Sequence, residues 1–371
     1  MKILELLGEP IANGGQEAFV INFINAIDMF DLSIDLLTPY NCSNNYYKTI
    51  VENKGGRVYS FNLPFAPGKS RRNIIKPLKK FLKSNHYDVV HIHSGSISVL
   101  KYASLAAKKA KVKKIIVHSH CAADRKTFKY RLVKLFSMPT LSLCPTDYCA
   151  CSQIAGDWKF SKRIAKKKLI ILKNGVDLCE FSFKPEMRDI MRQSLGIANG
   201  ELVIGHVGRF SYQKNHEYLL KIQSDLKKNK VNSKLLLIGS GELFYEVKEQ
   251  AVKDNILDEI IFVGNVDNVA DYMQAMDVFA LPSRFEGLPI VGVEAQASGL
   301  PCVFSNAITE EAHLTNQVEF LPITDEAVAE WSKVMQLLSN QERKDNRIIL
   351  KEKGFDINAT ADKILALYKN I

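Results

Sequence analysis

Short apolar runs alternate with longer amphipathic stretches along nearly the whole chain. The apolar runs are typical of buried strands, and the stretches between them repeat apolar residues every three or four positions, as helices do. Strands and helices that alternate in this way form parallel sheets covered by helices on both faces. The pattern therefore predicts an α/β protein.

The predicted elements fall into two successive sets with the same alternation. In the first set we expect strands at residues 2–7, 33–37, 57–61, 89–93 and 114–119, a last strand within 141–151, and a run leading out at 168–172. Its helices are expected at residues 16–27, 46–54, 73–84 and 99–109. The second set has strands at residues 203–207, 234–238, 260–263, 277–281 and 302–305, and helices that include 216–228, 243–255 and a final one at 356–370.

The length of the chain also favours two domains. At 371 residues the chain exceeds the usual size of a single hydrophobic core. A turn is predicted at residues 174–177, which read Asn-Gly-Val-Asp and lie between the two sets of elements. We therefore expect two tandem domains of one topology.

Basic residues are concentrated in the first half of the chain. Residues 1–180 hold 29 Lys and Arg against 13 Asp and Glu, an excess of 16, whereas the rest of the chain holds 21 against 27. Such an asymmetry indicates a nucleic acid or an anionic membrane as partner. The basic residues are not interleaved with aromatic ones, as they would be in a protein that stacks bases. We therefore expect a membrane surface and no nucleic acid.

One predicted helix carries much of this charge. Within residues 73–84, Lys76, Lys79, Lys80 and Lys83 fall near one face, and the apolar residues fall on the other. Each basic residue near an anionic membrane contributes about 1 kcal/mol, so four to six of them would suffice for reversible docking.

Cysteine use and hydropathy indicate the cytoplasm. The chain has seven cysteines, an odd number, and none forms a C-x-x-C pair. Reduced thiols are therefore favoured over a metal site at Cys121, Cys144, Cys149 and Cys151. Residues 1–7 are expected to form a first strand rather than a signal peptide, and no run approaches the roughly 18 apolar residues of a membrane span.

Two glutamates frame a short predicted helix after the strand at 277–281. Glu286 lies in the loop before this helix, and Glu294 lies about one and a half turns inside it. Pro289 suits the first helical position, and Gly299 suits the left-handed residue that ends a helix. The free N–H groups of a helix N-terminus favour a phosphate, so the two carboxylates could hold hydroxyl groups on either side of a diphosphate.

A second loop, after the strand at 203–207, carries two cations. Arg209 and Lys214 lie five residues apart, and together they could clamp a diphosphate. Ligands of open parallel sheets bind beyond the carboxyl ends of the strands, where both loops are expected. Fixed cations there would stabilise the charge of a leaving diphosphate without a metal.

Residues 282–289 read P-S-R-F-E-G-L-P, and residues 294–301 read E-A-Q-A-S-G-L-P. This pattern resembles the signature of retaining GT-B glycosyltransferases, more narrowly those of family 4, group 1, which include bacterial capsule and exopolysaccharide transferases. The likeness extends over nearly the whole chain. It implies an α/β fold with two facing Rossmann-like domains, parallel sheets and an active site in the inter-domain cleft.

The resemblance also implies domain bounds. Residues 1–183 would form an N-terminal Rossmann-like acceptor domain, and residues 184–355 a C-terminal Rossmann-like nucleotide-sugar domain. The hinge would lie near residues 181–185. The final helix, at about 356–371, would pack back on the N-terminal domain.

Each donor-site residue of the second half receives a role from the resemblance. Glu286 would face the hydroxyl groups of the transferred sugar, and Glu294 would hold the ribose hydroxyls. Arg209 and Lys214 would clamp the diphosphate, and the backbone N–H groups of Gly287 and Leu288 would approach the phosphates. Gly239 would lie in the loop beside the nucleotide, and the backbone at Val263 would pair with the base.

In the first half, the resemblance implies that Gly15 lies at the donor phosphate or at the acceptor edge. His120 would lie close to the transferred sugar and is the expected catalytic histidine. His118 has the same parity but lies one pleat deeper, and His93 ends a neighbouring strand. No carboxylate in the motifs of the first half stands out as the nucleophile that a covalent intermediate would need, and Asp124 is the only nearby candidate. The resemblance implies front-face attack.

The expected activity is a retaining, metal-independent hexosyl transfer without any cofactor. The donor would be a nucleotide sugar, with UDP the favoured nucleotide, and the acceptor a lipid-linked saccharide or glycan of bacterial surface polysaccharide synthesis. The protein would dock peripherally on the inner leaflet of the plasma membrane. The alternatives are a UDP-sugar 2-epimerase of the same fold, which would need an acid/base set in the first domain, and a non-enzymatic nucleic-acid binder.

Overall fold

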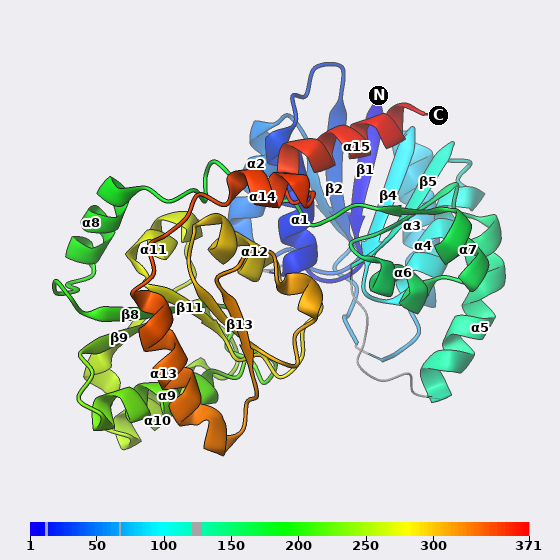
Figure 1. The fold of residues 1–371 in the computed structure, drawn as a ribbon. Helices are drawn as coiled ribbons and strands as arrows, with labels where there is room; N and C mark the ends of the chain where they lie inside the picture. The colour runs from blue at the N-terminus through cyan, green and yellow to red at the C-terminus, as the bar shows by residue number, and fades with distance from the viewer. Residues whose placement is uncertain (12–13, 67, 121–127, 371) are drawn as a thin grey trace. The chain divides into compact units, whose positions relative to one another are not determined.

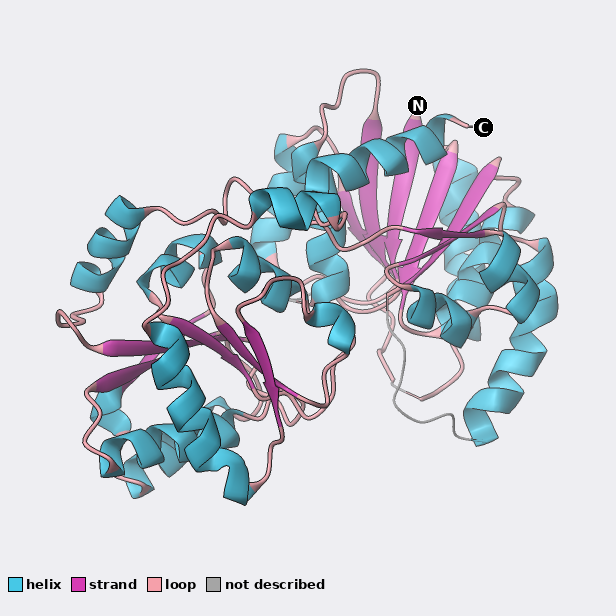
Figure 2. Ribbon diagram, viewed as in Figure 1, coloured by secondary structure: helices cyan, strands magenta, loops and turns pink. Residues whose placement is uncertain are grey.

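A computed structural model describes residues 1–11, 14–66, 68–120 and 128–370. The chain forms two compact units, Met1–Gly175 with Ile357–Ile371, and Val176–Asp356. The sequence placed this division at residues 183 and 184. Each unit is built on one parallel sheet with helices on both faces, as Figures 1 and 2 show. The predicted α/β architecture is confirmed.

The sheet of the first unit has seven parallel strands in the order β3-β2-β1-β4-β5-β6-β7. These strands are β1 (Lys2–Leu7), β2 (Ser33–Thr38), β3 (Val58–Ser60), β4 (Val89–Ser94), β5 (Lys114–Ser119), β6 (Asp147–Ala150) and β7 (Leu169–Ile171). The helices are α1 (Gly15–Ala26), α2 (Asn45–Asn53), α3 (Ile75–Asn85), α4 (Ile97–Lys109), α5 (Phe128–Leu143), α6 (Gln153–Lys159), α7 (Lys162–Lys167) and α15 (Ile357–Lys369).

Alternation along the central strands assigns side chains to the two faces of this sheet. Even-numbered residues of β1, such as Leu4, pack against α3 and α4, whereas Ile3 and Leu7 pack on the side of α1 and α15. Figure 1 shows α15 lying beside β1, so the last helix of the chain completes the core of the first unit.

The sheet of the second unit has six parallel strands in the order β10-β9-β8-β11-β12-β13. These strands are β8 (Leu202–Val207), β9 (Ser233–Ile238), β10 (Ile260–Gly264), β11 (Val278–Leu281), β12 (Cys302–Ser305) and β13 (Val318–Leu321). The helices are α8 (Pro185–Ser194), α9 (His216–Lys228), α10 (Phe244–Lys253), α11 (Val269–Ala275), α12 (Ile290–Ala297), α13 (Val328–Ser339) and α14 (Arg347–Glu352).

The strand order reverses once in each sheet. The reversal lies between β1 and β4 in the first unit and between β8 and β11 in the second. Loops that leave two such strands diverge to opposite faces and open a crevice at the carboxyl edge, which is where open α/β sheets bind ligands. Among the described residues, no helix is both long and apolar enough to cross a membrane.

Candidate active site

The loops that follow β8 and β11 are bonded to each other at the reversal of the second sheet. The N–H of Arg284 donates to the carbonyl of Gln213 at 2.8 Å, and the Gln213 amide donates to the carbonyl of Phe285 at 3.0 Å. The amide of Asn215 donates to the carbonyl of Pro282 at 3.1 Å. The two motifs that the sequence singled out therefore form one continuous site.

Lys214 and Glu286 meet within this site. The Lys214 ammonium lies 2.7 Å from Glu286 Oε1, and the two side chains are only 16% and 12% exposed. The hydroxyl of Ser283 also donates to Glu286 Oε1, at 3.4 Å. A ligand with a phosphate next to hydroxyl groups could bind here, with the phosphate on the cation and a hydroxyl group on the carboxylate.

Glu294 projects from α12 near the same pair. The pKa of its carboxyl is raised to about 7, mainly by burial and also by the neighbouring Glu180, while the charge of Lys214 acts in the opposite direction. A carboxyl that titrates near neutrality can accept or donate a hydrogen bond to a sugar hydroxyl.

Arg209 lies in the same loop but has a different partner. Its Nε donates to Glu242 Oε2 at 3.0 Å, and the side chains are 68% and 53% exposed. An exposed ion pair contributes little to stability, so a diphosphate could displace Glu242 from Arg209 at small cost.

The loop after β9 is held between the loops that follow β8 and β10. The N–H of Gly239 donates to the carbonyl of Gly264 at 2.8 Å, and the N–H of Phe210 donates to that of Ser240 at 3.0 Å. Gly239 has a φ of +132°, and a Cβ there would lie 2.2 Å from the carbonyl oxygen of Gly208. Only glycine permits this approach.

The remaining donor-site candidates line the same edge of the sheet. Val263 lies near the end of β10, and Gly287 and Leu288 lie in the loop just before α12. A Cβ at Gly287 would meet no atom within 4 Å. The surface around its backbone is therefore open to a ligand.

In the first unit, a buried chain of hydrogen bonds leads to His120. The hydroxyl of Tyr368, on α15, lies 2.5 Å from Glu5 Oε1. Glu5 Oε2 lies 2.7 Å from Nε2 of His93, and Nδ1 of His93 lies 2.8 Å from Nε2 of His120. Because one nitrogen of His93 faces Glu5 and the other faces His120, the position of the proton on His93 depends on whether Glu5 carries a proton. The same two hydrogen bonds hold the ring of His120 in place.

Burial keeps this histidine cluster neutral. It lowers the pKa of His120 to about 3, and it lowers the pKa of His91, His93 and His118 well below the ordinary value. The imidazoles of His91, His93 and His118 bring one ligand atom each within 4.8 Å of one another. Among the described residues this is the group that could hold a metal ion, and it lies in the first unit rather than at the diphosphate loops.

Comparison with known proteins identifies the family. Residues 13–180 match the family described as Glycosyltransferase Family 4, and residues 187–354 match Glycosyl transferases group 1. EpsF of Bacillus subtilis strain 168, which is named as a glycosyltransferase, is 31% identical over 362 residues, 96% of this chain and 93% of EpsF. The chain belongs to the group 1, family 4 glycosyltransferases. The resemblance found in the sequence is confirmed.

One further relative and one solved structure are similar to this glycosyltransferase over most of its length. A UDP-Gal:alpha-D-GlcNAc-diphosphoundecaprenol alpha-1,3-galactosyltransferase of Escherichia coli is 28% identical over 321 residues, 81% of this chain and 79% of the relative. The structure of Anabaena HepE in complex with UDP and glucose has a TM-score of 0.75 at 19% identity and covers 100% of both chains. The latter likeness confirms the GT-B fold.

The structure adds one carboxylate that the sequence analysis passed over. Glu9 follows β1 at the reversal of the first sheet, and its Oε1 accepts a hydrogen bond from the Ser94 hydroxyl at 2.9 Å. Gly15, the candidate of the first half, is the first residue of α1. Burial raises the pKa of Glu9. Its place directly after a strand was the available signal. Asp124, the earlier candidate, lies outside the described residues.

The predicted basic helix is α3, preceded by a short 3-10 turn. Lys76, Lys80 and Lys83 are exposed, whereas Lys79 is half-buried. Arg71, just before this turn, is buried, and its guanidinium lies 4.6 Å from the ring centre of Phe65. The basic face of the helix is therefore narrower than the sequence indicated.

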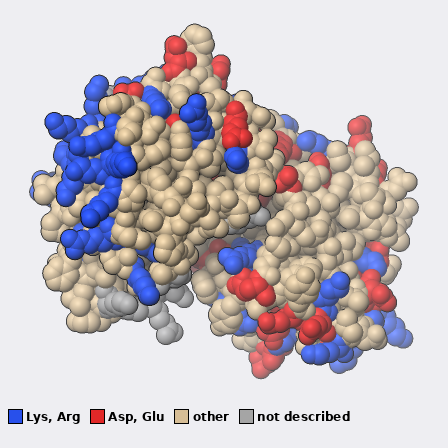
Figure 3. Space-filling model, turned by 180° about the vertical axis from the view of Figure 1, so that it is seen from behind, with Lys and Arg blue, Asp and Glu red and all other residues tan. Residues whose placement is uncertain are grey.

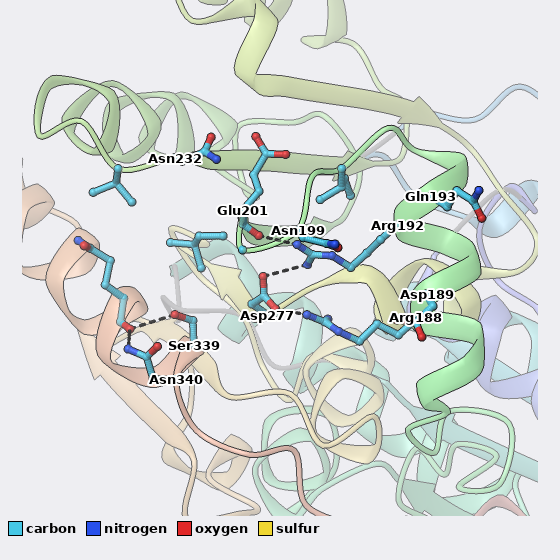
Figure 4. A pocket seen from close by; sticks show the side chains of 15 residues that line it. Arg188, Asp189, Arg192, Gln193, Asn199, Glu201, Asn232, Asp277, Ser339 and Asn340 are labelled. Atoms are coloured by element: carbon cyan, nitrogen blue, oxygen red, sulfur yellow. Dashed lines mark hydrogen bonds and ion pairs between the residues drawn. The ribbon is translucent and has the colours of Figure 1, made fainter.

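A cavity of about 1010 Å³ lies at the opposite edge of the second sheet (Figure 4). It is lined by Arg188 and Arg192 of α8, whose guanidinium groups lie 2.5 Å and 3.2 Å from Asp277, just before β11. These charges are already paired at the amino ends of the strands. We therefore infer that the ion pairs in this cavity hold α8 in place, and that the cavity does not bind the sugar donor.

Gly239→Ala should disrupt the donor loops, because its Cβ would collide with the Gly208 carbonyl. We expect the free energy of unfolding to fall by about 2 kcal/mol and UDP binding to weaken, as measured by urea denaturation and calorimetry. Gly287→Ala is the matched control, since its Cβ has free space, and should change stability by less than about 0.5 kcal/mol. Equal losses in the two variants would contradict this account of the loops.

Glu294→Gln should change the pH dependence of stability. The pKa of Glu294 is about 7 in the folded chain against 4.5 ordinarily, so the folded state holds its proton more tightly and loses stability as pH rises through this interval. From pH 5 to pH 8 the variant should gain about 1–3 kcal/mol relative to wild type. The exposed Glu249→Gln serves as control, and parallel profiles for all three proteins would refute the shift.

Proposed function

We propose that this glycosyltransferase moves a hexose from a UDP-sugar to a lipid-linked saccharide or glycan acceptor, with retention of anomeric configuration and without a metal. The observation that carries the proposal is the half-buried Lys214–Glu286 pair, held between bonded loops beside Glu294. HepE was solved with UDP and glucose, and the E. coli relative is named for galactosyl transfer from UDP-Gal to a diphosphoundecaprenol-linked sugar. Both names support a UDP donor, and the name of the E. coli relative also supports a lipid-linked acceptor.

Each group at the site has a role in this proposal. Lys214 and Arg209 bind the diphosphate and stabilise its charge as the bond to the sugar breaks. Glu286 holds hydroxyl groups of the transferred sugar, and Glu294 holds those of the ribose. His120 lies close to the transferred sugar, with its imidazole neutral. In front-face attack, the leaving phosphate accepts the proton of the acceptor hydroxyl, so no enzyme nucleophile is needed.

The first unit would bring this chemistry to the cytoplasmic leaflet of the membrane. Lys76, Lys80 and Lys83 offer exposed positive charge along α3, and Lys79 adds its charge at the edge of the same face. At about 1 kcal/mol for each residue, these four support reversible electrostatic docking on anionic lipid.

A UDP-sugar 2-epimerase is the second candidate, because such an enzyme needs acid/base groups in the first unit. The buried carboxyl of Glu5 and its hydrogen bond to His93 are groups of that kind. The sugar product would separate the two activities, since an epimerase releases an isomer in the absence of any acceptor.

The direct test is product analysis with a panel of UDP- and GDP-sugars and a lipid-linked acceptor. We expect transfer from a UDP-sugar, a product whose C1–H1 coupling in NMR matches the donor's anomer, and unchanged turnover after treatment with EDTA. Inversion would reject the retaining mechanism. Activity lost with EDTA and restored by Mn²⁺ would reject metal independence.

Removal of the two carboxylates should have unequal effects on the enzyme. Glu294→Gln should mainly weaken UDP binding, by roughly 1.5–3 kcal/mol for a charge-assisted hydrogen bond. Glu286→Gln should lower turnover more than affinity for bare UDP, because Glu286 faces the sugar. Calorimetry with UDP and initial rates with the UDP-sugar measure the two effects, and similar losses of UDP affinity in both variants would contradict the assigned roles.

A further inference from the structure

Helix α5 carries a row of large apolar side chains on its outer face. Phe128, Leu132, Leu135, Phe136 and Leu143 are between 40% and 76% exposed. Their spacing of three and four residues places them along one side of the helix, together with the exposed Pro139. We call these six residues the outer face of α5.

The inner face of α5 packs into the hydrophobic core of the first unit. Leu141 is fully buried, and Tyr130 and Met138 pack against the same cluster, which includes residues of α4. The hydroxyl of Tyr130 also donates to the carbonyl of Trp158 at 2.9 Å. A surface helix normally turns polar residues to water, so packing among the described residues of this unit does not account for the apolar outer face.

Positive charge borders the outer face. The Lys101 ammonium donates to the carbonyl of Phe136 at 2.8 Å, and Arg131 is exposed on α5 itself. Lys108 and Lys109 are exposed in the last turn of α4, which packs against α5. In Figure 3, Lys and Arg side chains gather over the first unit, on the left.

We propose that the outer face of α5 inserts into the headgroup–acyl boundary of an anionic bilayer, and this rests on the proposed function at a membrane. An apolar strip bordered by Lys and Arg is the pattern of helices that lie in the plane of a membrane interface. A second copy of the chain is a poorer partner, because pairing these faces would bring two strongly basic units together. Anionic lipid offers both hydrocarbon and the opposite charge.

The proposal divides membrane binding into two parts with different salt dependence. The lysines of α3 attract the anionic surface, and this attraction is screened within about 10 Å at 0.1 M salt. Insertion of α5 buries apolar surface and is insensitive to such screening. Salt should therefore remove the contribution of α3 while the contribution of α5 persists.

Vesicle sedimentation can separate these parts, with phosphatidylglycerol and phosphatidylcholine vesicles at low and high salt. Leu135→Ser/Phe136→Ser should weaken binding to anionic vesicles about tenfold or more, which corresponds to about 1.4 kcal/mol. Lys76→Ser/Lys80→Ser/Lys83→Ser should weaken binding at low salt only. Leu337→Ser/Ile348→Ser is the matched control, because these side chains of the second unit are 61% and 73% exposed, and it should bind as wild type does.

A tryptophan at position 136 would report insertion directly. Phe136→Trp should show fluorescence quenched by lipids that carry a quencher on the acyl chain, beyond the signal of the parent protein. Wild-type binding unchanged in Leu135→Ser/Phe136→Ser, or a wild-type dimer that this variant converts to a monomer, would overturn the proposal. Hydrolysis of the UDP-sugar in solution should stay unchanged in the variant, so its absence in wild type would count against the proposed function and not against insertion.

Discussion

The donor site depends on how closely three backbone loops approach one another at the edge of the second sheet. Gly239 lies against the carbonyl of Gly208, where no side chain fits, and the hydrogen bonds at Gly264 and Ser240 follow from that contact. These loops, rather than the flexible side chain of Lys214 alone, fix the position of its ammonium group. A side chain with so many rotamers would lose considerable entropy on binding a ligand, and fixed loops lower that cost.

Burial of charge sets the chemistry of both units, in opposite ways. In the second unit, Lys214 and Glu286 are half-buried and neutralise each other, while burial leaves Glu294 with a raised pKa. In the first unit, Glu5 and the histidines are buried together, no Lys or Arg of the described residues pairs with Glu5, and burial raises the pKa of Glu5 to about 8. The site of the second unit suits a ligand that carries its own negative charge. The site of the first unit suits exchange of protons between neutral groups.

Much of this architecture could be predicted from the sequence, because short apolar strands and a two-glutamate motif are local signals. The strands β1 and β5 have the predicted bounds, and the loops of Lys214 and Glu286 come together as parallel-strand topology requires. Non-local features were missed. The bonds of Glu5 to His93 and Tyr368 join residues far apart in the chain, and α5 has apolar residues on both faces, so no single apolar stripe marks it as a helix. Its last residues also overlap the strand expected within 141–151, and that strand, β6, begins only at Asp147.

The place of α15 in the first unit has a consequence for synthesis of the protein on the ribosome. The core around Glu5 receives Tyr368 and Ile364 only after all of the second unit has been translated. Until then, the face of β1 and β4 that α15 will cover is exposed to water with a carboxyl and two imidazoles on it. The hydrophobic core of the nascent first unit therefore stays incomplete until α15 has been synthesised. A chaperone that shields this face would have the longest time to bind it during that interval.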